Sequence, residues 1–248
     1  MDLPGESSLD QILSRLILTD PPLLPRKVLF WGEGAGEISS YISGWMTGQG
    51  IDVVVLDGAN QFDPYVVSSF AKKAMIPPKN LLKRIRIARA FTCYQMATLV
   101  EEKLIALLRR EEAISQAHKP WVILLGPITT FLDEDVPERE SRLLFERMLR
   151  KIEEMAMEGV SFYLFQPNSP SPPLTKVGTT RNRGGSRGLV NSTRAFLARR
   201  LFQISTLVWT IHWEEEGAKL VLEKSIDYVI PVKTGIQAKR HGFLLPQE

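Results

Sequence analysis

Short apolar runs alternate with longer stretches of helical periodicity over residues 27–166. The runs that predict strands are KVLFW (27–31), DVVVLD (52–57), RIRIAR (84–89), WVILLG (121–126) and SFYLFQ (161–166). The stretches that predict helices are 37–46, 64–75, 93–113 and 139–159. Continuous apolar strands that alternate with helices are typical of a parallel sheet covered by helices on both faces. The pattern therefore predicts an α/β fold.

Two of these helices carry apolar residues at three- and four-residue spacing, which predicts a face that packs on the core. In the helix at 93–113 the stripe is Met96, Leu99, Val100, Leu104, Leu107 and Leu108. In the helix at 139–159 it is Leu144, Met148, Ile152 and Met155.

The pattern changes after residue 166. A stretch rich in Pro, Gly and Ser covers 167–194, and connections of this length are usually functional or disordered. Residues 205–225 form two strand-like runs around EEEG, which predicts an antiparallel hairpin added to the sheet. We predict a helix and linker at 1–19, one core domain at 20–225, and an irregular tail at 226–248.

Composition excludes several classes of protein. The 248 residues contain a single cysteine, Cys93, so an internal disulfide and a multi-cysteine zinc site are excluded. The three histidines, His118, His212 and His241, are scattered, and we expect no metal site. No apolar run is long enough to cross a membrane, and the N-terminus is polar and acidic, which predicts a cytoplasmic protein with no membrane partner. The net charge of +3 is too small to indicate nucleic acid by itself.

The glycines of WGEGAGEISS (31–40) follow the first predicted strand and precede a predicted helix, which is the context of a phosphate-binding P-loop. The candidate nucleotide loop comprises Gly32, Glu33, Gly34, Ala35, Gly36, Glu37, Ile38 and Ser39. A working P-loop places a lysine on the phosphates, but that position falls here on Glu37 or Ile38. The segment is either a site that holds nucleotide through its backbone amides or the remains of one.

The order of elements and several motifs resemble the RecA/RadA family of strand-exchange recombinases over roughly residues 20–225. The most specific segment is LDGANQFDPYVVSSFAKKAMIPPKNLLKRIRIARAFTCYQ (56–95). The strand SFYLFQPN (161–168) and the closing hairpin LVWTIHWEEEGAKLVLEKS (207–225) also resemble the family. The resemblance implies a RecA-like P-loop NTPase core, with a mainly parallel sheet flanked by helices and a C-terminal antiparallel hairpin.

The resemblance also implies that three catalytic groups are missing. The P-loop lysine is replaced at Glu37 or Ile38, the magnesium-shell aspartate falls on Gly126, and the water-activating glutamate falls on Ala59. We therefore expect no catalytic residue and negligible ATP hydrolysis. We expect no cofactor, with weak ATP binding as the alternative. Gln166 matches the position that senses the γ-phosphate, although it could equally be an ordinary amide at a strand end.

Basic residues occupy the place of the family's second DNA-binding loop, TKVGTTRNRGGSRG (175–188). Flexible glycines and hydroxyls between cations suit contact with a phosphate backbone. The predicted DNA-binding residues are Lys176, Arg181, Arg183 and Arg187, with Arg194 on the helix that follows. The alternative is a solvated loop. Near the family's first DNA loop, LDEDVPERES (132–141) is acidic, and we interpret it as a solvated turn.

Two further sets of residues are candidates for a catalytic role. Asp57 and Asp63 could form an acid/base pair, but Asp63-Pro64 is also a natural helix start. Cys93 has no histidine near it in sequence, so we expect a buried apolar role rather than a nucleophile.

Three hypotheses remain open at this point. The first, which we favour, is a non-catalytic RecA-like paralog in DNA recombination or repair. Its partners would be single-stranded DNA, an active recombinase, a polymerase or another repair protein. The second is a weak or atypical ATPase. The third is a protein-interaction module that binds no nucleic acid.

Overall fold

The computed structural model describes residues 27–114, 119–167, 187–214 and 217–225, and these form one seven-stranded sheet flanked by helices. The strand order is β3-β2-β4-β5-β1-β6-β7, and every neighbouring pair is parallel except β6 with β7. The strands are β1 (Lys27–Gly32), β2 (Val53–Asp57), β3 (Ile85–Arg89), β4 (Trp121–Leu125), β5 (Phe162–Gln166), β6 (Leu207–Glu214) and β7 (Gly217–Ser225). The predicted α/β class, parallel sheet and C-terminal hairpin are confirmed.

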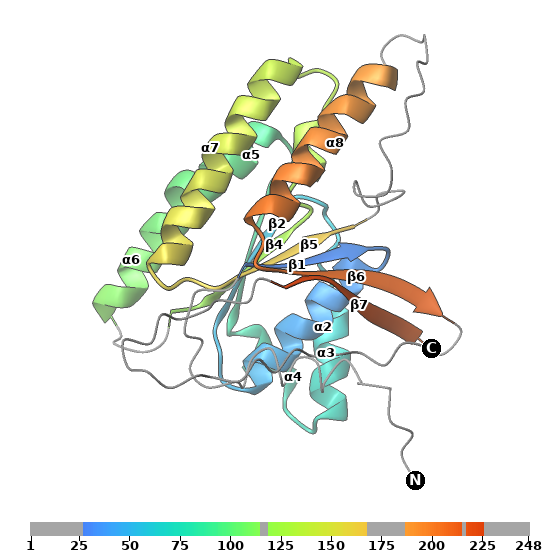
Figure 1. The fold of residues 1–248 in the computed structure, drawn as a ribbon. Coiled ribbons are helices and arrows are strands. Elements are labelled where there is room, and N and C mark those ends of the chain that lie inside the picture. The colour runs from blue at the N-terminus through green and yellow to red at the C-terminus, as the bar shows by residue number, and fades with distance from the viewer. Residues whose placement is uncertain (1–26, 115–118, 168–186, 215–216, 226–248) are drawn as a thin grey trace, which may run out of the picture.

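Helices cover both faces of the sheet (Figure 1). The helices on one face are α2 (Ala35–Gly48), α3 (Pro64–Lys73) and α4 (Pro78–Leu82). On the other face lie α5 (Cys93–Thr98), the π-helix η1 (Leu99–Leu104), α6 (Ile105–Ile114), α7 (Glu138–Met157) and α8 (Arg187–Ile204). A short 3-10 helix, η2 (Thr129–Leu132), follows β4. None of the helices in the described ranges is both long and apolar enough to cross a bilayer.

The predicted apolar stripes form the core. Met96, Val100, Leu104 and Leu108 of α5–α6 are buried, and Leu99 and Leu107 pack against the same cluster. In α7, Met148, Ile152 and Met155 are buried and Leu144 packs beside them. The run predicted as one helix at 93–113 is helical throughout, but its middle turn is π-helical.

Three local predictions need correction. The stretch 167–194 is not all loop, because α8 already begins at Arg187. Residues 78–82, for which we predicted no element, form α4, which begins at a proline, a residue suited to the first turn of a helix. Gly32 to Gly36 do not all lie in a loop, since Gly32 ends β1 and Ala35 begins α2. Residues 1–26, 168–186 and 226–248, which include the predicted N-terminal helix and tail, lie outside the described residues.

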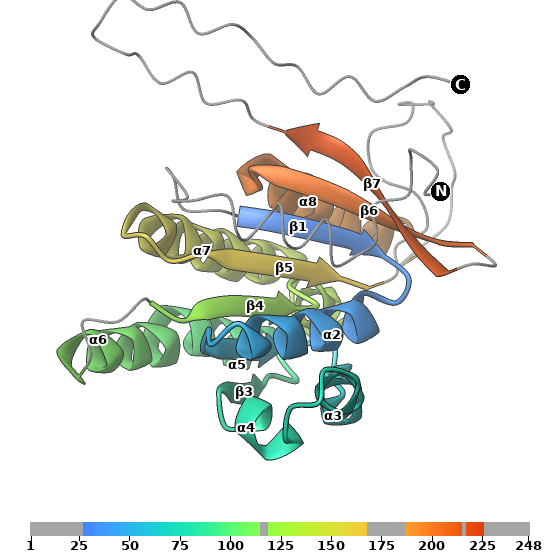
Figure 2. The same cartoon turned by 90° about the horizontal axis from the view of Figure 1, so that it is seen from below.

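The parallel strands all end at one edge of the sheet, which we call the carboxyl edge (Figure 2). The chain leaves β1 into α2 on one face and leaves the adjacent strand β5 towards α8 on the other face. The neighbouring strands β2 and β4 diverge in the same way, into α3 and α7. Ligands of open α/β sheets bind where adjacent strands diverge like this. The ends of β1, β5, β2 and β4 are therefore the first place to look for a site.

Candidate functional site

The connection between β1 and α2 is a tight turn of two residues, Glu33 and Gly34. Gly34 has a left-handed backbone with φ of 74° and is the N-cap of α2. A P-loop instead has four residues between its glycines, and their amides surround the phosphates. The turn seen here is too short to enclose a phosphate in that way.

Packing explains the other two glycines of the motif. A Cβ on Gly32 would lie 2.5 Å from the carbonyl oxygen of Ile211 in β6. A Cβ on Gly36 would lie 2.7 Å from the Cβ of Gln61, in the loop after β2. Both positions need glycine because neighbouring segments approach closely, so the motif does not require a phosphate to account for it.

The side chains at the start of α2 serve the fold. Ile38 is buried in the core, and Ser39 is fully buried and donates its hydroxyl to the carbonyl of Gly36 at 2.7 Å. Glu37 is exposed in the first turn, where its negative charge favours the helix dipole and repels phosphate. The lysine and the magnesium-binding hydroxyl of a P-loop therefore have no counterpart here.

The segments that follow β2 and β4 pack closely against each other, and the position of Gly126 has no room for a side chain. Gly126 follows β4 with φ of 67°, and a Cβ on it would lie 2.7 Å from the Cβ of Ala59. A Cβ on Gly58 would similarly lie 2.5 Å from the terminal methyl of Met96. The positions at which the resemblance places an aspartate and a glutamate, Gly126 and Ala59, are thus in mutual contact.

Asp57 and Asp63 organise the loop between β2 and α3. The fully buried carboxylate of Asp57 accepts hydrogen bonds from the amides of Ala59, Gln61 and Phe62 at 3.0–3.2 Å. Arg89 at the end of β3 lies 3.6 Å from the same carboxylate. Asp63 caps α3 by accepting from the amide of Tyr65 at 2.8 Å, with Pro64 as the first helical residue. Both carboxylates hold backbone in place, which favours the structural interpretation over an acid/base pair.

Gln166, the predicted phosphate sensor, is buried at the end of β5. Its Oε1 accepts from the amide of Ile128 at 3.1 Å and its Nε2 donates to the carbonyl of Pro167 at 2.9 Å. Both ends of the amide are engaged with the backbone, and the side chain ties the segment after β4 to β5. Whether it also senses a ligand stays a prediction.

The predicted DNA-binding residues are only partly described. Lys176, Arg181 and Arg183 lie outside the described residues, and Arg187 is the first residue of α8. Arg194 is half-buried on the same helix. Further along α8, Arg200 forms a two-pronged contact with Glu146 of α7 at 2.5 and 2.8 Å. This hydrogen bonding raises the pKa of the Arg200 guanidinium, although its partial burial acts in the opposite direction.

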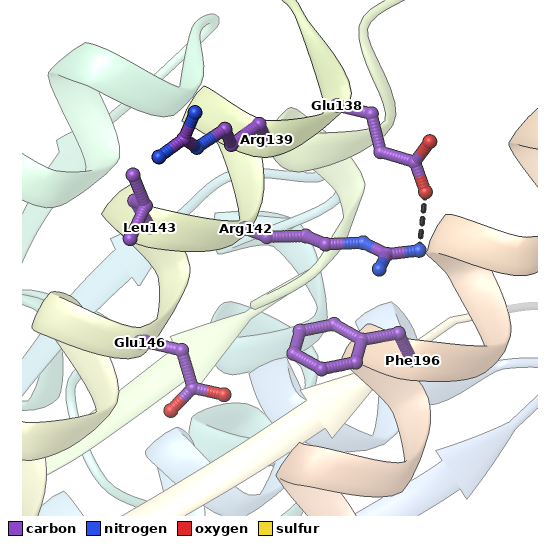
Figure 3. Close-up of a pocket in the computed structure, with 6 residues that line it drawn as sticks. All are labelled: Glu138, Arg139, Arg142, Leu143, Glu146 and Phe196. Atoms are coloured by element: carbon purple, nitrogen blue, oxygen red, sulfur yellow. Dashed lines mark hydrogen bonds and ion pairs between the residues drawn. The ribbon is translucent and has the colours of Figure 1, made fainter.

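A groove of about 360 Å³ lies between α7 and α8 (Figure 3). It is lined by Glu138, Arg139, Arg142, Leu143, Glu146 and Phe196. The guanidinium of Arg142 pairs with Glu138 and lies 4.6 Å from the centre of the Phe196 ring. Sequence reasoning did not find this groove, because its two walls are separated by a long stretch of chain and carry no recognisable motif.

The structure also shows the surroundings of Cys93 and of the acidic turn at 132–141. Cys93 is buried, and this burial raises the pKa of its thiol, which suits an apolar role better than a nucleophile. Asp133, Glu134 and Asp135 are exposed, as predicted for a solvated turn. Across the described residues, no three His, Cys, Asp or Glu side chains converge as metal ligands.

No protein-family model matches this sequence, and no curated protein matches it. The function proposed below therefore depends on the resemblance of the motifs and on the geometry of the carboxyl edge.

Proposed function

We propose that the protein is a non-catalytic paralog of the RecA/RadA recombinases that acts in DNA recombination or repair. It does so by binding single-stranded DNA, an active recombinase, or both. The fold supports this proposal, because the resemblance implies a mainly parallel sheet, a glycine turn after its first strand and a C-terminal antiparallel hairpin. The protein needs no cofactor in this role.

One observation supports the non-catalytic part of the proposal above all others. Gly126 cannot accept a side chain without movement of its neighbours, because an added Cβ would lie 2.7 Å from the Cβ of Ala59. An ATPase needs magnesium and a positioned water at this place. Together with the short turn before α2, this contact supports the proposal that the protein does not hydrolyse ATP, with weak nucleotide binding to backbone amides as the alternative.

The DNA-binding part is tested with the triple variant Arg181→Ala, Arg183→Ala, Arg187→Ala. Each phosphate contact that is lost lowers the slope of log affinity against log salt by about 0.7 for single strands, so we expect a decrease of about 2. The measurement is the fluorescence anisotropy of labelled oligothymidine over a series of salt concentrations. The matched control is Lys103→Ala, Arg109→Ala, Arg110→Ala, which removes three exposed cations from η1 and α6.

Equal binding by the loop triple variant and the control would refute the contact through this loop. Absence of binding by the unmodified protein at low salt would refute the DNA role altogether.

The groove between α7 and α8 favours a second candidate, a protein-interaction module. Leu143, which lines the groove, is 58% exposed. Exposed apolar side chains beside a groove are common at protein contacts. In this case Leu143→Glu would abolish binding to an active recombinase in a pull-down with both proteins purified, whereas the remote exposed Met157→Glu would not.

A further inference from the structure

The positive charge of this protein is concentrated in one stretch of chain. Residues 64–100 contain seven lysines and arginines and no aspartate or glutamate. The whole chain carries +3, so the remaining residues sum to 3 − 7 = −4. The chain is therefore strongly polarised, although its net charge is small.

The fold places these cations along one margin of the molecule. They lie at the end of α3, on α4 and on β3, which is the outermost strand of the sheet (Figure 2). We call this surface the basic edge, and its residues are Lys72, Lys73, Lys79, Lys83, Arg84, Arg86 and Arg89. All of them have exposed side chains.

Most of this charge is not neutralised by the protein itself. Arg84 pairs with Asp52 at 3.0 Å, and Arg89 lies 3.6 Å from Asp57. Within the described part of the chain, no carboxylate lies within 4 Å of the four lysines, Lys72, Lys73, Lys79 and Lys83. Four lysines at the neighbouring helices α3 and α4, with no paired carboxylate among the described residues, form a surface suited to a polyanion.

Exposed aromatic rings stand at the carboxyl end of the same edge. Phe91, two residues after β3, is 67% exposed, and Tyr94 at the start of α5 is 46% exposed. The amide of Phe91 donates to the side chain of Gln95 at 2.8 Å, so the backbone beneath the ring is held in place. Aromatic rings on which bases stack, combined with basic residues, are typical of surfaces that bind single strands.

We propose that the basic edge binds the sugar-phosphate backbone of single-stranded nucleic acid, with Phe91 stacking on a base at its carboxyl end. Lysine is depleted at protein–protein interfaces, whereas phosphate contacts depend on it. A membrane is a poorer match, because peripheral binding needs a continuous apolar face. Here the exposed apolar residues Met75, Ile87 and Phe91 alternate along the chain with exposed lysines and arginines.

Arg89 and Phe91 lie at the carboxyl end of this surface, at the sheet edge where β5 also ends, whereas Arg84 lies at its amino end beside Gly50 and Asp52. β3 is three strands from β5, a separation of about 14 Å at the usual spacing of about 4.8 Å between strands. The inference nevertheless depends only on the basic edge and needs neither the loop nor the resemblance to recombinases.

The test compares two variants of the full chain that have the same net charge. The first is Lys72→Ala, Lys73→Ala, Lys79→Ala, Lys83→Ala, and the second is Lys103→Ala, Arg109→Ala, Arg110→Ala, Arg150→Ala, on the helices of the opposite face. Each variant lowers the net charge from +3 to 3 − 4 = −1. Any difference in affinity between the two variants therefore reports the position of the lost charges rather than the total charge.

Binding to labelled oligothymidine is measured by anisotropy over a salt series. We expect the basic-edge variant to bind at least about tenfold more weakly than the control at low salt, with a slope smaller by about 0.7 for each lysine that contacts a phosphate. Phe91→Ala should weaken binding roughly tenfold and leave the slope unchanged, because stacking releases no counter-ions. The remote exposed Met157→Ala should change neither quantity.

The two quadruple variants binding alike would overturn the proposal. So would binding of the unmodified protein to phosphatidylserine vesicles but not to oligothymidine. The loop triple variant separates this inference from the proposed function. If only the loop triple variant loses affinity for oligothymidine, the basic edge is refuted and the loop contact stands. If only the basic-edge variant loses affinity, the loop contact is refuted and the basic edge stands.

Discussion

Glycine and small residues at the carboxyl edge act by allowing close approach between segments. At Gly32, Gly36, Gly58 and Gly126, an added Cβ would lie 2.5–2.7 Å from its nearest neighbour, closer than real Cβ atoms come. The contact of Gly126 with Ala59 brings the segments after β4 and β2 together, and the other three bring Gly32 to β6, Gly36 to Gln61 and Gly58 to Met96. At the residue scale, the proposed absence of ATP hydrolysis therefore depends on space as well as on missing functional groups.

Replacing Gly126 with aspartate should not rebuild a metal site. We expect Gly126→Asp to lower the free energy of unfolding by about 2–4 kcal/mol, from positive-φ strain and from overpacking against Ala59. It should give no magnesium-dependent ATP hydrolysis. The measurements are denaturant unfolding and a phosphate-release assay.

The control for this variant is Gly159→Asp. Gly159 also has a positive φ, of 94°, but nothing lies within 4 Å of its added Cβ, so this change reports the backbone strain without the overpacking. Two results would contradict a closed carboxyl edge. One is a Gly126→Asp protein that loses no more stability than the control, and the other is turnover of ATP by that protein at about 1 per second.

At the scale of elements, the hairpin β6–β7 anchors α8. Lys224 of β7 donates from its Nζ to the carbonyls of Phe202, Gln203 and Ser205 at 2.7–3.1 Å, at and just beyond the end of α8. A cation at a helix C-terminus satisfies free carbonyls and complements the helix dipole. Burial, followed by the charge of Lys27, lowers the pKa of Lys224, so part of this gain is offset by desolvation.

We therefore expect a moderate loss of stability when residue 224 no longer carries hydrogen-bond donors. Lys224→Met keeps the apolar stem and should lower the free energy of unfolding by about 1–2 kcal/mol, towards the low end for hydrogen bonds to a charged group. Hydrogen exchange should become faster in the last turn of α8 in particular. Lys103→Met, at an exposed site on η1, should change stability by less than about 0.5 kcal/mol, and a similar effect of both substitutions would refute the capping role.

At the scale of the whole molecule, two hydrophobic clusters share one sheet. Alternate residues of each central strand face opposite clusters, as Leu29 and Phe30 of β1 do. The Phe30 ring stacks on Phe165 of β5 at 4.8 Å, which also connects the first strand to its neighbour within one cluster. Because every central strand belongs to both clusters, we expect that neither face unfolds while the other remains intact.

Unfolding should accordingly be a single transition. Ile42→Ala on α2 and Ile152→Ala on α7 remove fully buried side chains from opposite clusters, and each should cost about 2–5 kcal/mol. Both variants should shift the same transition, followed by circular dichroism and by tryptophan fluorescence. Two transitions, each sensitive to only one of the variants, would show that the faces fold separately.

Local pattern in the sequence determined the class of fold. The strands, the long helices and the closing hairpin follow from the spacing of apolar residues, because side chains alternate faces in strands and repeat every three to four residues in helices. The start of α3 at Asp63-Pro64 was also predictable from the sequence, because a capping side chain acts on the amides nearest to it in the chain. The excess of cations between residues 64 and 100 is likewise a property of the sequence alone.

Tertiary structure decided what the candidate site can do. The glycine motif looked like a phosphate loop, but Ile211 and Gln61, distant in the chain, explain two of its glycines. Gln166 and Asp57 could have been functional groups, yet their partners are backbone atoms that only the fold brings near. The groove between α7 and α8, and the position of four lysines along one open margin, likewise depend on contacts between distant segments. Periodicity reports the surroundings of a residue within a few positions, whereas the use of a polar or small side chain depends on which distant atoms pack against it.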